Sequence, residues 1–213
     1  MTDQRPALQL CHVGTIGAGG IESGCEIEDV TFACEAGTWT ALAGPTAAEK
    51  TSVLRCAAGL DPVTEGEVRL AEGFRLAHVG LRSLTEQLAT TDTLASVLAR
   101  LPARAAELLH EALHRLDLWE ERNSPVLALT ESRQRAAAVA IAVADAPDVL
   151  LADGLTSGLP PATAAAILDL LRDQVDQRGL CVVASAADLA SLERADVVVL
   201  LAEGRVVETR LMP

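Results

Sequence analysis

Apolar residues occur along the chain in short blocks, and the spacing inside each block predicts an element. Three continuous apolar runs are typical of strands covered on both faces, and they lie at 148–153, 180–185 and 197–201. Apolar residues at helical spacing fill 132–144 and 161–177. Strands and helices therefore alternate, and we expect the three runs to form the parallel centre of a sheet.

The first quarter of the chain contains shorter strand patterns around a glycine-rich turn. They predict strands at 7–13, 26–33 and 38–44, the last of which stops at Gly44. After a tight loop, a helix is expected from Lys50 to Ala58. Strand, tight loop and helix thus follow one another here as they do later in the chain.

Residues 84–128 carry helical patterns that interrupt this alternation before the sheet resumes at 148. The economical interpretation is a helical subdomain, at about 81–145, inserted in an α/β core. No repeat, low-complexity tract or shift in composition divides the chain further. The expected organisation is a single domain over residues 1–213.

Composition limits the core and the partners. Half of the 213 residues are apolar but only 2% are aromatic, so Ala, Val and Leu must build a layered core. A formal charge of −13 repels phosphate backbones, because nucleic-acid affinity depends on Lys and Arg. Nucleic acid is therefore not an expected partner.

The cysteines and the apolar runs indicate a compartment. Five cysteines without C-x-x-C spacing suggest small buried residues rather than a disulfide framework or a zinc site, and hence a reduced cytoplasm. No run reaches the roughly 20 apolar residues of a membrane span, and the first residues lack the apolar part of a leader. Any membrane role would come through a partner.

Two histidines and two tryptophans have simple interpretations. His110 and His114 lie four apart on an expected helix, where a surface pair is far commoner than a zinc site. Trp39 and Trp119 are interpreted as core residues rather than platforms for a cofactor.

Three segments carry motifs in a fixed order. Residues 41–70 contain GPTAAEKTS, residues 129–163 contain LTESRQR and LLADGLTSG, and residues 195–208 contain ADVVVLLAEGRVVE. In order and spacing they resemble the ATP-binding subunits of ABC transporters, closest to the short ATPase subunits of lipoprotein-release and macrolide-efflux systems. The resemblance implies an α/β, P-loop NTPase-like fold with a mostly parallel central sheet, an antiparallel β subdomain and a helical insertion.

Part of the family's nucleotide chemistry is retained. The resemblance implies that Gly44, Lys50, Thr51 and Ser52 bind the phosphates of ATP, and that Thr51 and Asp153 hold Mg²⁺. The alternative is that Lys50 and Asp153 are solvated caps at the ends of a helix and a strand.

The loop before Lys50 differs from the family. Glu49 and Ala47 stand where glycines are usual. A carboxylate about 5 Å from a phosphate charge costs about 3 kcal/mol at an effective dielectric near 20. Glu49 avoids that cost if it turns outward or pairs with Lys50, and binding is weakened either way.

The hydrolytic positions are changed as well. The base that should follow Asp153 is Gly154, the switch histidine falls on Ala187, and the loop glutamine falls on Leu81, unless a longer loop brings Gln87 there. Losing a general base typically lowers a rate by about 10²–10⁴-fold. We therefore expect no catalytic residue.

The motifs that act across a dimer are altered too. The signature reads Leu129-Thr130-Glu131-Ser132-Arg133 without glycines, and the distal loop, Ser157-Gly158-Leu159-Pro160, lacks its aspartate. Residues 14–18 offer no aromatic platform for adenine. At most, weak binding of ATP and Mg²⁺ is expected.

The leading hypothesis is a degenerate, catalytically silent ABC subunit. The chemistry is altered while the fold-building positions Gly59, Pro62, Gly66 and Gly204 remain. Such a chain would be a structural or regulatory partner of a permease and a second ATPase-type subunit in a heteromeric complex. It would dock through residues 81–128 and lie at the inner face of the membrane.

Two alternatives stay open. The first is a slow but genuine ATPase that drives transport with Lys50, Thr51 and Asp153. The second is a soluble binding or regulatory protein that uses the family's nucleotide cleft for another ligand. Glu49 and Glu131 would suit a cationic ligand in that case.

Overall fold

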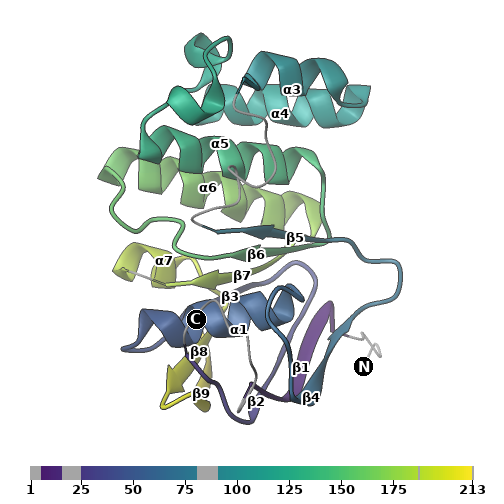
Figure 1. Ribbon diagram of the computed structural model, residues 1–213, viewed down its shortest axis with the longest axis vertical. Helices are drawn as coiled ribbons and strands as arrows, with labels where there is room; N and C mark the ends of the chain where they lie inside the picture. The colour runs from purple at the N-terminus through teal and green to yellow at the C-terminus, as the bar shows by residue number, and fades with distance from the viewer. Residues whose placement is uncertain (1–5, 16–24, 81–90, 187, 213) are drawn as a thin grey trace.

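The chain folds into stacked layers of helix and sheet (Figure 1). A computed structural model describes the chain except for residues 1–5, 16–24, 81–90, 187 and 213. Helices α5 and α6 cover one face of a central sheet, and helix α1 covers the other (Figure 1). Helices α3 and α4 form a further layer outside α5 (Figure 1).

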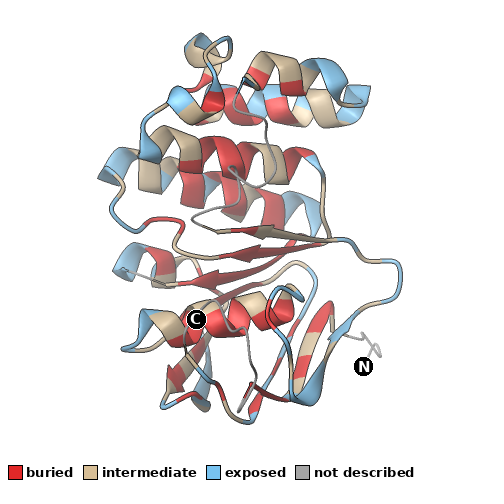
Figure 2. Ribbon diagram, in the orientation of Figure 1, coloured by how far each residue is buried: buried red, intermediate tan, exposed pale blue. Residues whose placement is uncertain are grey.

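The central sheet has six described strands. Their order is β5 (Leu76–Val79), β6 (Val149–Ala152), β7 (Cys181–Ser185), β3 (Trp39–Ala43), β8 (Val197–Ala202) and β9 (Arg205–Leu211). The first five run parallel, and β9 returns antiparallel along β8. Every residue of β6 and β7 is buried, which explains their continuous apolar sequences (Figure 2). The three predicted runs do lie in the parallel part.

A smaller antiparallel sheet lies beside α1 (Figure 1). Its order is β2 (Val30–Cys34), β1 (Leu8–Gly14) and β4 (Glu65–Leu70). Strand β2 alternates buried and exposed residues, so one face of this sheet packs on the core. Five of the six residues of β4 are exposed, and its sequence EGEVRL therefore gave no apolar run from which to predict it.

The helices divide the apolar core into two clusters. One cluster joins α5 and α6 to the sheet, and the other joins α1 to the sheet and to β1 and β2. The helices are α1 (Ala47–Ala57), α3 (Leu94–Arg100), α4 (Ala103–Arg115), α5 (Glu131–Ala144), α6 (Pro161–Arg178) and α7 (Leu189–Glu193), with 3-10 turns at Trp119–Glu121 and Val126–Ala128. Buried alanines line α5, which lets it pack closely on its neighbours (Figure 2).

Helix α1 begins at Ala47, so the prediction that it begins at Lys50 is wrong. Two alanines, the best helix formers, precede an acidic residue, Glu49, in the first turn. The segment that the resemblance marks as a phosphate loop is therefore partly wound into helix. By contrast, α6 begins at Pro161 and ends before Gly179, as predicted; this glycine has a left-handed φ of 72°.

Two further observations concern the predicted organisation. None of the described helices is long and apolar enough to cross a membrane. The helices between β5 and β6 correspond to the expected insertion, but its start near 81 lies outside the described residues, so its bounds stay a prediction.

Candidate functional site

The retained residues meet at the carboxyl ends of three adjacent strands. Gly44 follows β3, Asp153 follows β6, and Ser185 ends β7, and these strands lie in the order β6, β7, β3. Helix α1 starts directly after β3 and brings Lys50 and Thr51 to the same edge. In open α/β sheets this edge is where ligands bind.

Asp153 is held by two hydroxyl groups. Thr51 Oγ1 donates to its Oδ2 at 2.7 Å, and Ser185 Oγ donates to its Oδ1 at 2.8 Å. The predicted pair Thr51 and Asp153 is therefore brought together across 102 residues of sequence. Both carboxylate oxygens have a fixed hydrogen-bond donor.

Lys50 folds back onto the loop. Its Nζ donates to the backbone oxygen of Gly44 at 2.7 Å. The residue is buried, with 8% of its surface exposed. Gly44 has a φ of 149°, and a Cβ there would lie 2.4 Å from the backbone oxygen of Leu201. Only glycine fits this position, whatever its role toward a ligand.

Glu49 takes neither of the two orientations that the sequence suggested. It is only 7% exposed, and its Oε1 accepts a hydrogen bond from the backbone N–H of Gly204 at 3.1 Å. The expectation that it turns outward or pairs with Lys50 is therefore wrong, because the turn between β8 and β9 offers it a donor. Within the described part of the chain, its Oε2 has no hydrogen-bond partner.

Ser52 and Cys25 connect α1 to the segment before β2. Ser52 is fully buried and donates to the backbone oxygen of Cys25 at 2.6 Å. Burial, followed by the charges of Glu49 and Glu26, raises the pKa of the Cys25 thiol. The phosphate-binding role assigned to Ser52 stays a prediction.

The backbone of Gly154 is held on both sides. Its N–H donates to Ser185 Oγ at 2.7 Å, and its oxygen accepts from Arg135 Nη1 at 3.3 Å. Gly154 also has a left-handed φ of 64°, which side-chain-bearing residues rarely adopt. Neither Arg135 nor Ser185 was singled out from the sequence; for Arg135 the available signal was an arginine at the start of an alanine-rich helix.

The altered signature segment forms the start of α5. Thr130 is its N-cap, and Thr130 Oγ1 lies 3.3 Å from Ser132 Oγ. Glu131 Oε1 accepts from Arg135 Nη2 at 2.8 Å. Arg135 also donates to the backbone oxygen of Ser157 in the distal loop. The signature and the distal loop are therefore joined inside one chain.

Three positions from the sequence lie outside the described residues. They are the expected switch position Ala187 and the two candidates for the loop glutamine, Leu81 and Gln87. Their assignments stay predictions.

The histidine pair belongs to a surface aromatic cluster. The rings of His110 and His114 lie 4.6 Å apart, and the Trp119 ring lies 4.5 Å from the first and 4.7 Å from the second. Arg122 stacks over Trp119 at 4.2 Å. Trp39 is fully buried, as expected, but Trp119 is only half-buried at the edge of the core. Within the described residues, no three His, Cys, Asp or Glu side chains form a metal-binding group.

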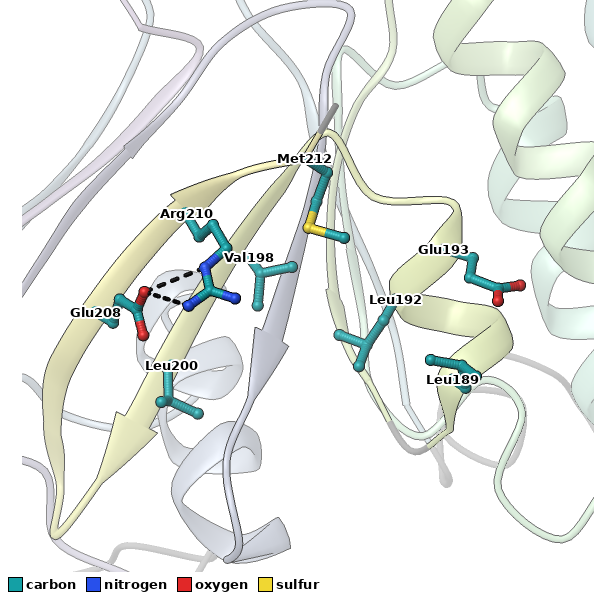
Figure 3. A pocket seen from close by; sticks show the side chains of 8 residues that line it. All are labelled: Leu189, Leu192, Glu193, Val198, Leu200, Glu208, Arg210 and Met212. Atoms are coloured by element: carbon teal, nitrogen blue, oxygen red, sulfur yellow. Dashed lines mark hydrogen bonds and ion pairs between the residues drawn. The ribbon is translucent and has the colours of Figure 1, made fainter.

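A groove elsewhere has a different character (Figure 3). It lies between α7 and the β8–β9 hairpin and has a volume of about 340 Å³. Apolar side chains of both elements line it, and an ion pair of Glu208 and Arg210, 2.8 Å apart, lies on its β9 side (Figure 3). It shares none of the residues around Asp153.

The donor set around Asp153 fits Mg²⁺. A hydroxyl and a carboxylate are the oxygen ligands that this ion prefers, and Thr51 and Asp153 present both within hydrogen-bond distance. The first turn of α1 offers backbone N–H groups without intrahelical partners, beside Lys50, so a phosphate is chemically suited to it. The buried charge of Glu49 in that turn opposes such binding.

Comparison with known proteins identifies the class. The sequence pattern of the ABC transporter family matches residues 27–157, more than half of the chain. The α/β layers and the site at the strand ends agree with that match. The chain belongs to the ABC transporter family, as an ATP-binding domain.

Curated relatives come from import systems. A hypophosphite import ATP-binding protein of Stutzerimonas stutzeri is 30% identical and covers 94% of this chain, which spans 66% of that relative. A phosphonates import ATP-binding protein of Trichodesmium erythraeum is 31% identical, with 81% of this chain and 76% of the relative covered. The likeness to lipoprotein-release subunits stays a prediction.

Solved structures confirm the expected fold. A dimeric ATP-binding cassette in a post-hydrolysis state bound to ADP and Pi superposes with a TM-score of 0.80 at 21% identity, over 97% of this chain and 99% of that one. An ATP-binding subunit of an ABC transporter gives 0.79 at 21% identity, over 97% and 90%. The mostly parallel sheet, the antiparallel sheet and the helices between β5 and β6 are thus those of an ABC ATPase.

Proposed function

We propose that this chain is an ATP-binding subunit of an import-type ABC transporter that binds nucleotide weakly and does not hydrolyse it. The import systems of its relatives support the direction of transport. A permease and a second ATPase-type subunit are its proposed partners, and residues 81–128 are the proposed docking region for the permease. The chain would thus contribute architecture and regulation, and its partner would supply turnover.

The state of Gly154 carries the proposal. Bound ATP and Mg²⁺ would supply a phosphoryl group and its charge neutralisation, but hydrolysis also needs a group that orients water. At the position after Asp153 there is no side chain, and the backbone N–H and carbonyl oxygen of Gly154 are engaged by Ser185 and Arg135. Nothing at this point of the chain can accept a proton from water.

Retained binding is supported by Lys50, the only lysine in a chain with 17 basic residues. Arginine serves every other basic position, yet the compact ammonium group of lysine stands where the phosphate loop requires it. The Thr51 and Asp153 pair lies beside it. This arrangement favours a nucleotide site over simple caps.

The second alternative, a soluble protein with a cationic ligand, loses its support. It depended on free charges at Glu49 and Glu131. Glu49 instead accepts from the backbone of Gly204, and Glu131 pairs with Arg135.

The single lysine gives a direct test. Amine acetylation, followed by mass spectrometry of the Lys50 peptide, should show protection by millimolar Mg·ATP, and phosphate release should stay at the level of buffer. A Lys50→Arg variant keeps the positive charge but has no amine to acetylate at this position, so it is the control for acetylation elsewhere in the chain. Turnover that disappears in Lys50→Ala would instead establish the slow ATPase, and co-purification with membranes tests the proposed permease.

A further inference from the structure

Two residues to which the resemblance assigns no role organise the end of β6. We propose that Ser185 and Arg135 are positioning residues, which set the Asp153 carboxylate for magnesium and tie it to helix α5. The inference rests on the proposed function, because it assumes that Mg·ATP binds at Thr51 and Asp153. It adds a route by which a subunit without hydrolysis can respond to nucleotide.

Ser185 fixes the orientation of the carboxylate. Its hydroxyl has one proton, which goes to Asp153 Oδ1 at 2.8 Å, and its oxygen accepts the Gly154 N–H at 2.7 Å. The residue is 8% exposed, so water does not readily replace these bonds. Oδ2 is thereby directed to Thr51, the other proposed magnesium ligand.

Arg135 connects the backbone of Gly154 to α5. It is 8% exposed, and its guanidinium donates to the backbone oxygens of Gly154 and Ser157 and to Glu131. Its planar fork of donors reaches several acceptors at once, which a lysine in the same place cannot do. A shift at the end of β6 therefore acts directly on α5.

The first turn of α5 reaches outward as well. Two residues before Arg135, Arg133 donates to the backbone oxygen of Asp117 at 2.5 Å, in the loop that leads to Trp119. Asp153, α5 and the segment after α4 are thus linked through hydrogen bonds and one rigid helix. Trp119 lies at the far end of this chain of contacts and can report on it by fluorescence.

The Ser185 step is tested by affinity for ATP with and without magnesium. We expect Ser185→Ala to weaken binding about tenfold in Mg²⁺ and less than about twofold in EDTA, since its hydroxyl acts on the metal ligand. Ser185→Thr keeps the hydroxyl and should restore the magnesium effect. Equal losses in both conditions would show a merely structural role and overturn this step.

The Arg135 step is tested by fluorescence of Trp119. The chain has two tryptophans, and Trp39→Phe leaves Trp119 as the single emitter. The change removes no described hydrogen bond of Nε1, and the cavity that it leaves in the core is common to all variants compared. In the Trp39→Phe protein, Mg·ATP should change the Trp119 emission. Adding Arg135→Lys should reduce that change about fivefold while affinity stays within about threefold. Arg172→Lys, on α6, is the matched control and should leave the response intact.

The outcomes separate this inference from the proposed function. If Mg·ATP fails to protect Lys50 in the unmodified chain, both are wrong. If it protects Lys50, but Arg135→Lys keeps the full Trp119 response, the link to α5 is wrong and the proposed nucleotide site stands. Should Arg135→Lys fail to fold, the Ser185 variants still decide the positioning of Asp153.

Discussion

The two sides of Asp153 differ in how far they keep the family's chemistry. On the side of α1, Thr51 is hydrogen-bonded to Asp153, and Lys50 is hydrogen-bonded to the backbone of Gly44. On the side of Gly154, where the proposal expects no base, the residue has no side chain and its backbone contacts Ser185 and Arg135. Both sides lie at the carboxyl end of β6, so under the proposed function binding and hydrolysis depend on different neighbours of one aspartate.

The largest expected effect comes from placing a carboxylate side chain at position 154. Gly154→Glu should lower stability by about 1–2 kcal/mol, because a non-glycine residue then adopts a left-handed φ. It should not by itself create hydrolysis, since the expected switch position is Ala187 and the signature at 129–133 has no glycine. Chemical denaturation and phosphate release are the measurements.

Gly158 provides the control for that variant. It has a similar φ of 72°, and no atom lies within 4 Å of a Cβ built there. Gly158→Glu therefore carries the same charge and backbone cost without touching the held peptide. Phosphate release about 100-fold above this control would break the distinction between the two sides.

An intermediate effect is expected on the α1 side. Glu49→Gly should raise ATP affinity by about tenfold, because a buried charge leaves the first turn of α1. The same change removes the hydrogen bond to Gly204 and should lower the melting temperature. Isothermal calorimetry and thermal unfolding measure the two effects.

Glu49→Gln separates charge from helix geometry. Glutamine keeps the length and the acceptor for Gly204 but carries no charge. If charge opposes phosphate, both variants gain affinity. If the helical conformation of the first turn of α1 is the obstacle, only Glu49→Gly gains affinity. Unchanged affinity in both variants would show that Glu49 does not oppose binding.

The smallest effect concerns alkaline pH. Burial, followed by the charge of Asp61, raises the pKa of the Cys56 thiol to about 11 from 9.0. Because the pKa of this thiol is higher in the folded chain than in the unfolded chain, it contributes to the free energy of unfolding. The contribution is fully present below pH 9 and is lost as the pH rises from 9 toward 11. Other thiols act in the same direction, because the pKa is also raised at Cys25, mainly by burial, and at Cys181, mainly by its hydrogen bond with Cys34. Removing the Cys56 thiol should therefore remove part of the alkaline loss.

The corresponding measurement compares unfolding free energies at pH 8 and pH 10.5. Cys56→Ala should flatten the alkaline loss of stability, and Cys11→Ala, at a less buried position, serves as the reference. Cys56 lies on helix α1, as Lys50 does. An unchanged slope in Cys56→Ala would assign the loss to other groups.

Periodicity and resemblance predicted the parallel core and the Thr51–Asp153 pair well, because buried runs and motif spacing are local signals. They missed the start of α1 at Ala47, where helix propensity extended the helix into the loop. They also missed the direction of Glu49 and the roles of Ser185 and Arg135. Those depend on backbone donors and acceptors in distant segments, which no local pattern records.

Gly44 has a consequence for how such sequences are classified. A side chain at this position would collide with the backbone of Leu201, so the glycine is required by the meeting of β3 and β8 even in a chain that binds nothing. A genome survey that counts this residue as part of an intact nucleotide motif would therefore overstate the number of working transport motors. The residue before the lysine and the residue after the aspartate are the more informative markers.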